Sequence, residues 1–127
     1  MASIKKLSLK DAFASFDDCW NPRIAGEVNG MHVKVVRAKG EFIWHQHETE
    51  DELFWVVSGS LKMRFRDGDV VVNPGEFIIV PHGVEHCPVS EEGCEIVLFE
   101  PKSTLNTGDV SNERTRRELE HVAVSES

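Results

Sequence analysis

Tyrosine is missing from this sequence of 127 residues, and both cysteine and positive charge are scarce. The three cysteines, Cys19, Cys87 and Cys94, have no regular spacing, and an odd number is a poor framework for disulfides. The 14 lysine and arginine residues are outnumbered by 22 acidic residues, which gives a formal net charge of −8. Because nucleic acids and anionic membranes require basic surfaces, neither is expected as a partner.

Long hydrophobic runs are also missing. No apolar stretch approaches the length of a membrane span, and the first residues contain no apolar segment of signal-peptide length. Together with the lack of a disulfide framework, these absences favour a reducing, cytoplasmic location. The length is that of a single domain, which is large enough to bury a core without disulfides.

Short apolar or alternating segments fill the middle of the chain. Turns rich in glycine, proline, asparagine and aspartate separate them, and Asn29-Gly30 is typical of a two-residue hairpin turn. Many short strands in this arrangement predict an all-β sandwich or barrel. The expected strands cover residues 23–28, 31–38, 41–47, 52–58, 61–66, 69–72, 76–80, 86–89 and 95–100.

The two ends of the chain depart from this pattern. Residues 8–16 carry apolar side chains at helical spacing after a serine that can cap the first turn, which predicts a short helix. We therefore assign residues 1–22 to an N-terminal helix and lead-in, and residues 23–102 to the barrel. Residues 103–127 are a polar C-terminal tail, expected to be a marginal helix or a mobile segment.

Residues with metal-binding side chains lie in two stretches. His45 and His47 are separated by one residue, so on a strand both imidazoles point to the same face. Glu52 opens the next apolar run and can offer an oxygen to the same point, and His86 in the second stretch is the expected fourth ligand. Imidazole nitrogens with a carboxylate suit zinc, iron, nickel, cobalt or manganese. Three histidines and one glutamate leave open positions on an octahedral ion.

The spacing of these residues resembles that of the cupin superfamily. Residues 40–59 match its first motif, except that four residues instead of the usual five separate Gly40 from His45. Residues 75–90 match its second motif, with Ser90 where asparagine is usual. Similarity to the small single-domain bacterial cupins implies a double-stranded β-helix, a jelly-roll-like barrel with the metal inside. It also implies one divalent metal ion (iron, manganese, nickel or zinc) and a homodimer.

Alternation along the strands predicts the wall of a pocket beside the metal. If Glu52 points inward, every second residue after it does too, and the residue two before His45 joins them. Phe42, Trp44 and Trp55 then lie on the outer face, where either a subunit interface or a neighbouring element covers the tryptophans. The residues expected to line the pocket are Ile43, Phe54, Val56 and Met63.

His82 lies in the loop of the second motif, between Pro81 and Gly83. An imidazole there can act as a general acid or base, because the pKa of histidine lies near neutrality. The alternative is an ordinary solvent-facing loop residue. His82 is the candidate catalytic residue that the sequence offers in addition to the four ligands.

Three functions agree with these features, because a fold does not determine a reaction. The first is a metal-dependent enzyme on a small organic molecule, an oxygenase or alternatively an isomerase or lyase. The second is a binding or sensor module without turnover, favoured by the absence of a convincing acid–base pair and of tyrosine. The third is a structural barrel without metal.

Overall fold

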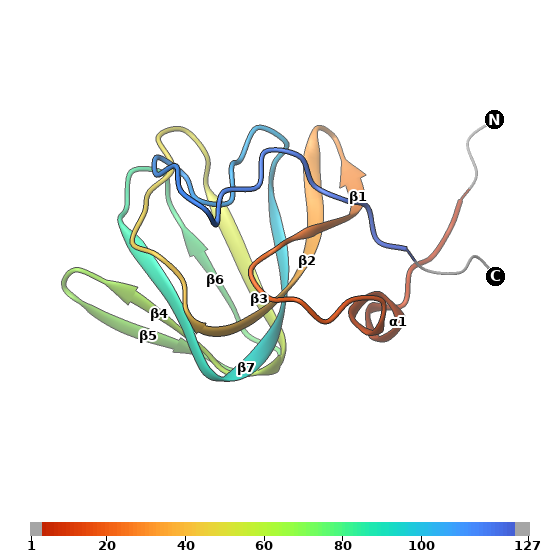
Figure 1. Ribbon diagram of the computed structural model, residues 1–127, viewed down its shortest axis with the longest axis horizontal. Helices are drawn as coiled ribbons and strands as arrows, with labels where there is room; N and C mark the ends of the chain where they lie inside the picture. Colours follow the sequence, from red (N-terminus) through yellow and green to blue (C-terminus); the bar gives the residue numbers. More distant parts are fainter. Residues whose placement is uncertain (1–3, 124–127) are drawn as a thin grey trace.

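The computed structural model describes residues 4–123 and contains one short helix and seven strands. Residues 1–3 of the predicted N-terminal region and residues 124–127 of the predicted tail lie outside the described part. The strands form an all-antiparallel sheet that curls into a barrel (Figure 1). The elements are α1 (Leu9–Ala14), β1 (Arg23–Val28), β2 (Met31–Glu41), β3 (Glu52–Gly59), β4 (Leu61–Phe65), β5 (Gly68–Val72), β6 (Phe77–Val80) and β7 (His86–Pro101).

The first elements agree with the sequence prediction. Helix α1 begins after Ser8, whose side chain accepts a hydrogen bond from the backbone N–H of Asp11. Strands β1 and β2 form the predicted hairpin, and both turn residues, Asn29 and Gly30, have positive φ angles of 47° and 78°. These angles are what a type I′ turn requires, and asparagine and glycine adopt them at low cost.

Strand β7 connects the parts of the barrel. Residues 86–89 and 95–100 were expected as two strands, but they belong to one long strand that bends near Gly93, where φ is 97°. Its first half pairs with β4 and the end of β2, and its second half pairs with β2 and β3. Because β7 contacts three strands, it places His86 at one end of the barrel interior and Glu100 on the strand beside Glu52.

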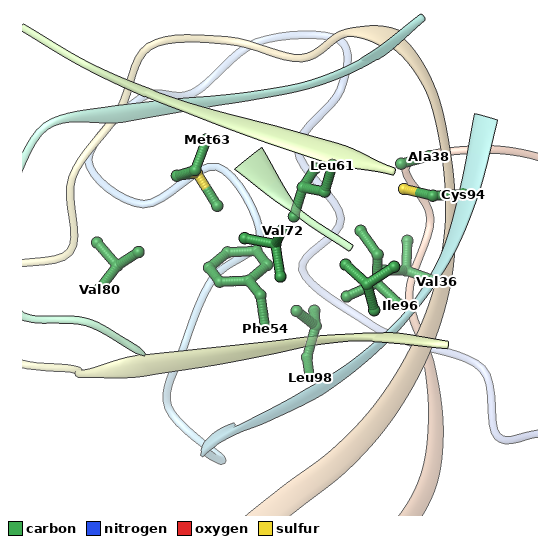
Figure 2. Packing of buried hydrophobic residues seen from close by; sticks show 11 residues of the cluster. Val36, Ala38, Phe54, Leu61, Met63, Val72, Val80, Cys94, Ile96 and Leu98 are labelled. Atoms are coloured by element: carbon green, nitrogen blue, oxygen red, sulfur yellow. The ribbon is translucent and has the colours of Figure 1, made fainter. Parts of the chain in front are cut away.

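The main core fills the barrel (Figure 2). Leu61, Met63 and Val56 are fully buried in it. A second cluster lies outside the barrel, where Phe13 and Ala12 of α1 pack on Val35 and Val97. Strand β2 is therefore apolar on both faces along part of its length. The residues of the main cluster are Val36, Ala38, Phe54, Val56, Leu61, Met63, Val72, Val80, Cys94, Ile96 and Leu98.

The three cysteines are free thiols, as the sequence predicts. Cys87 is fully buried, and burial together with the nearby charge of Glu41 raises its pKa to about 11. A thiol with such a pKa is not ionised near neutrality and is a poor nucleophile. Cys87 is therefore a packing residue.

The turn between β3 and β4 depends on Gly59. Its φ angle is 77°, and a Cβ atom at this position would collide with the carbonyl oxygen of Gly93 and with Cys94. Gly40 has a similar φ of 83°, but a Cβ atom there would meet nothing within 4 Å. Comparison of the two positions therefore distinguishes the cost of a left-handed backbone from the cost of a steric collision.

We expect Gly59→Ala to lower the free energy of unfolding by about 2–5 kcal/mol, the sum of left-handed strain and overpacking. Gly40→Ala should cost only the strain, about 1–2 kcal/mol. Urea unfolding followed by circular dichroism measures both changes. Equal losses in the two variants would show that the contact with Gly93 carries no energy.

Candidate metal centre

His45 and His86 are joined through their backbones. The N–H of each donates to the carbonyl of the other, at 3.0 Å and 2.9 Å. Apart from this isolated bridge, residues 42–47 are irregular, so the prediction of a continuous strand over residues 41–47 is wrong. The bridge nevertheless brings the two predicted ligand stretches together.

The rings of His45 and His86 are oriented in the same way. The Nδ1 atom of His45 lies 2.9 Å from the carbonyl oxygen of Ile43, and that of His86 lies 2.9 Å from the carbonyl oxygen of Val84. A carbonyl only accepts, so each Nδ1 carries the proton and donates it. The Nε2 atom of each ring is then left with a lone pair, which is the tautomer that a metal ligand needs.

His47 and Glu52 complete the cluster. Nε2 of His47 lies 3.2 Å and Nε2 of His86 lies 3.5 Å from Oε1 of Glu52. These three buried atoms have no hydrogen bond of acceptable geometry within the described residues. One ligand atom from each of His45, His47, Glu52 and His86 lies within 4.8 Å of the other three, and all four side chains are buried. The structure thus brings together the whole predicted ligand set.

Burial and proximity change the pKa values of these groups in opposite directions. Burial, with a contribution from His86, lowers the pKa of His45 to about 4. Burial would also lower the pKa of His47, but the Glu52 carboxylate outweighs it and the pKa is raised. Burial alone would raise the pKa of Glu52, but the neighbouring Glu100, His47 and His86 side chains outweigh it and hold the pKa well below its ordinary value. Burial and the charge of Glu52 raise the pKa of Glu100 well above its ordinary value.

This arrangement fits a divalent transition-metal ion. Buried nitrogen and oxygen atoms without hydrogen-bond partners are costly, and one cation among them would satisfy several lone pairs at once. Three imidazoles and one carboxylate are a donor set that zinc, nickel, iron and manganese accept. The Nδ1 hydrogen bonds of His45 and His86 also provide the support that bound imidazoles usually have.

Sequence reasoning missed two charged residues beside the cluster. Lys34 of β2 and Glu100 of β7 form an ion pair of 2.7 Å inside the barrel, with only 2% of each side chain exposed. Glu100 and Glu52 line the same cavity. Lys34 alternates with apolar residues along β2, and Glu100 ends an otherwise mostly apolar run, so neither pattern marks the residue as inward-facing. The available signal was the position of Lys34 two residues before Val36, which places both side chains on the same face of the strand.

A narrow cavity of about 40 Å³ adjoins the cluster. Phe54 lines it, together with His45, Glu52 and Glu100. This volume holds only a few water-sized groups. Most of the remaining wall is apolar, and it consists of Trp20, Pro22, Val36, Phe42, Pro88, Ile96, Leu98 and the more polar Asn106.

The rest of the pocket prediction needs correction. Phe42, expected on the outer face, lines the cavity, where its ring stacks on Trp20 and meets His45 edge-on. Ile43 does not line this cavity, because the chain is not a regular strand here and alternation fails. Val56 and Met63 do not line the cavity either, because both are fully buried in the main core.

His82 lies on the surface. Its backbone N–H and its Nδ1 both contact Oδ1 of Asp51, at 2.9 Å and 2.8 Å, and its side chain is 60% exposed. It is not among the residues that line the cavity. A catalytic role for His82 stays a prediction.

The C-terminal segment covers the mouth of the barrel. The described residues 103–123 contain turns and bends and no helix, and they cross one end of the barrel (Figure 1). Asp109 exchanges hydrogen bonds with the backbone of Gln46, between the first two histidines. Arg114 donates to the carbonyl of Glu41 and lies over the ring of Phe42. The marginal helix that was one of the two expectations is therefore not formed in this part of the chain.

An open, acidic cleft of about 370 Å³ lies between this segment and the loop after His47. His47 borders the cleft, and the acidic residues around it are Glu48, Glu50 and Asp109. The buried cluster is thus next to a negatively charged depression that faces solvent. Such a depression attracts cations.

An antiparallel barrel with a buried three-histidine, one-glutamate cluster defines the class of the protein. The sequence of residues 32–100 matches the family model described as "Cupin domain", and this match spans more than half of the chain. The chain belongs to the cupin family. Within the described residues, no helix is long and apolar enough to cross a membrane.

Three similar proteins illustrate the relationship. A cupin-2 domain protein from Shewanella frigidimarina is 40% identical, with a TM-score of 0.75 over 76% of this chain and 94% of that one. Protein NMB1881 from Neisseria meningitidis is 32% identical, with a TM-score of 0.71 over 77% and 100%. The uncharacterized protein YdbB of Bacillus subtilis is 36% identical over 61 residues, which are 47% of this chain and 54% of that protein. The chain thus matches about half the length of this curated relative.

Proposed function

We propose that the protein binds one divalent transition-metal ion, iron, manganese, nickel or zinc, through His45, His47, Glu52 and His86. The observation that carries this proposal is the set of buried, unpartnered ligand atoms that converge on one point. Membership of the cupin family supports it. The acidic cleft beside His47 offers the ion a path from solvent.

We further propose that the protein is a metal-dependent enzyme on a small organic molecule. When bound, the metal would supply Lewis acidity or, if it is iron or manganese, redox chemistry. The oxygenase reaction is the preferred version, and metal-assisted isomerisation or elimination is the alternative. Phe42 and Phe54 would exclude water and contact the carbon skeleton, while Glu100 is the additional polar group at the same end of the cavity.

The size of the cavity limits the substrate. A space of about 40 Å³ accepts a molecule of a few non-hydrogen atoms unless the covering C-terminal segment moves. Asn106 of that segment lines the cavity, so displacement of this segment would enlarge it. The favoured substrates are therefore very small, or they enter when residues 103–123 shift away from the mouth.

Elemental analysis of untagged protein purified without added metal tests the proposal. We expect about one equivalent of metal, lost in His45→Ala. Iron would direct the search to oxygen-consumption assays, and zinc, nickel or manganese to isomerase and lyase assays with small acids and alcohols. If the protein bound none of these four ions even when they were added, the proposed function would be wrong.

A binding or sensor protein without turnover is the second candidate. The exposed position of the His82–Asp51 pair favours it, because this pair lies outside the cavity and leaves few proton-transfer groups near a substrate. Ligand-dependent changes in association, with no product formed by metal-loaded protein, would support the sensor over the enzyme.

We also propose that the protein forms a homodimer through the outer face of β3 and β6. Trp55 and Phe77 are cross-strand partners on this face, and Ile79 lies beside them, with exposed fractions of 41%, 61% and 53%. Contiguous apolar side chains of this size are typical of an interface. Trp44 does not belong to this face, since it is half-buried under the guanidinium groups of Arg64 and Arg66.

We expect Phe77→Glu to convert a dimer into a monomer, because it buries a charge in the interface. Val71→Glu is the matched control, on a strand that pairs only with β4 and with an exposed fraction of 54%. Light scattering coupled to gel filtration gives the mass of each variant. A monomeric parent protein, or a dimer that survives Phe77→Glu, would contradict the proposed interface.

A further inference from the structure

The Lys34–Glu100 ion pair is buried inside the barrel, where an ion pair contributes little to stability. Nζ of Lys34 is 2.7 Å from Oε1 of Glu100, and both side chains are 98% buried. Removing two charges from water costs several kcal/mol per ion, and hydrophobic residues of similar volume often replace such pairs without loss. The neighbouring inward-facing positions of the same strands, Val36 and Leu98, are indeed apolar. A role other than stability is therefore indicated.

Strand register places this pair directly behind the candidate metal ligand. Leu53 of β3 pairs with Phe99 of β7, so one step further along the same ladder Glu52 faces Glu100. On the other side of β7, Lys34 pairs with Leu98, which puts it diagonal to Glu100. Two carboxyl groups facing each other across a ladder repel, and Lys34 is the cation that offsets this repulsion.

Glu52 lies between the histidines on one side and Glu100 on the other. Its Oε1 atom is turned to His47 and His86, at 3.2 Å and 3.5 Å. On the other side Glu52 adjoins Glu100, which lines the same cavity, and Glu100 is fixed by Lys34. The side chain of Glu52 is thus restrained from the barrel side while one oxygen remains directed at the histidines.

We propose that Lys34 and Glu100 are positioning residues that hold the Glu52 carboxylate in the orientation needed to bind the metal ion. This inference rests on the proposed metal site and adds two residues that neither the motif spacing nor the ligand cluster includes. Ligating carboxylates usually require such partners, and loss of one lowers metal affinity about 10–100-fold.

Substitutions at Glu100 separate positioning from simple packing. Glu100→Gln keeps an oxygen that accepts from Lys34 and an N–H group that can donate to Glu52. Glu100→Leu keeps most of the volume but neither contact. If the pair only filled space, leucine would serve as well as glutamine, whereas a positioning role requires that glutamine retains function and leucine does not.

The experiment is a titration with Co²⁺, followed by its visible absorption, which reports both the dissociation constant and the ligand geometry. We expect Glu100→Gln to bind Co²⁺ nearly as tightly as the parent protein. Glu100→Leu should bind about 10–100-fold more weakly, with a changed absorption spectrum. The control removes an exposed ion pair, Lys102 with Glu27 at 3.2 Å, by Lys102→Met and Glu27→Leu, and it should change neither quantity.

A second variant covers the case in which an unpaired buried lysine prevents folding. Lys34→Met combined with Glu100→Leu removes both charges, and such replacements are commonly tolerated. This double variant should fold, as judged by circular dichroism, and show the same weak Co²⁺ binding. Parent-like affinity and spectrum in a folded Glu100→Leu or double variant would overturn the inference, as would equal weakening by Gln and Leu. Absence of Co²⁺ binding by the parent protein would instead refute the metal site itself.

Discussion

His47→Ala is expected to reduce divalent metal affinity by more than 100-fold, because it removes one of four ligands and loss of a supporting residue alone costs about 10–100-fold. It also leaves Oε1 of Glu52 without its nearest neighbour, which lies 3.2 Å away in the parent protein. A ligand at 100 times its dissociation constant stabilises a protein by about 2.7 kcal/mol. We therefore expect metal to raise the Tm of the parent by about 10 °C and to leave the Tm of His47→Ala unchanged.

Thermal unfolding with and without added Zn²⁺ or Mn²⁺, together with equilibrium dialysis, measures these effects. His121→Ala is the matched control, since His121 is exposed and is held to β1 through a backbone bridge and not through its ring. The control should bind and respond to metal as the parent does. Retained one-to-one binding in His47→Ala would remove this residue from the ligand set.

The ligand set could be found from sequence because it depends on short spacings. One intervening residue brings His45 and His47 into the cluster even though the chain between Glu41 and Glu52 is not a regular strand. The backbone bridge between His45 and His86 then replaces the strand pairing that alternation assumes. The prediction of the ligands therefore did not depend on a regular strand at residues 42–47. The predicted directions of the Phe42 and Ile43 side chains did depend on one, because side chains alternate only within a strand.

Lys34 and Glu100 could not be placed with the same reasoning. Alternation in β2 gives two faces, and the face with Lys34 is the more polar one in the first half of the strand. It nevertheless points into the barrel, because β2 is buried on both sides, by α1 on one and by the main core on the other. When a strand is covered on both faces, its two faces do not differ clearly in polarity. Only the structure therefore reveals that Lys34 lies inside the barrel.

The C-terminal segment was beyond sequence analysis for another reason. Its order comes from hydrogen bonds between distant backbone groups, such as the N–H of Asp109 to the carbonyl of Gln46 and the N–H of Ile24 to the carbonyl of Glu120. Such contacts have no periodicity, and a polar composition hides them. Thr107 is fully buried in this segment, which a reading based on hydrophobic content does not predict.

Metal affinity is expected to fall as the pH is lowered from 7.5 to 5.5, by at least tenfold. Each histidine must be neutral to bind, so protons compete wherever the pKa of the metal-free site lies above the pH. The pKa of His47 is raised above its ordinary value of 6.5 by Glu52, so the metal-free ring carries a proton at the acidic end of this range and the metal must displace it. The pKa of His45 is lowered to about 4, so this ring stays neutral and adds to the loss only in more acidic solution.

The sign of this effect follows from the proton balance. The metal-bound form has fewer protons than the metal-free form below the pKa of His47, and affinity therefore rises with pH through that pKa and levels off above it. Calorimetric titration of Mn²⁺ in buffers with different ionisation enthalpies counts the protons released. We expect release near one proton or more at pH 6 and a smaller value at pH 8. Constant affinity from pH 7.5 to 5.5, with no proton release, would mean that the metal does not displace a proton from His47. The ion would then be held by other groups.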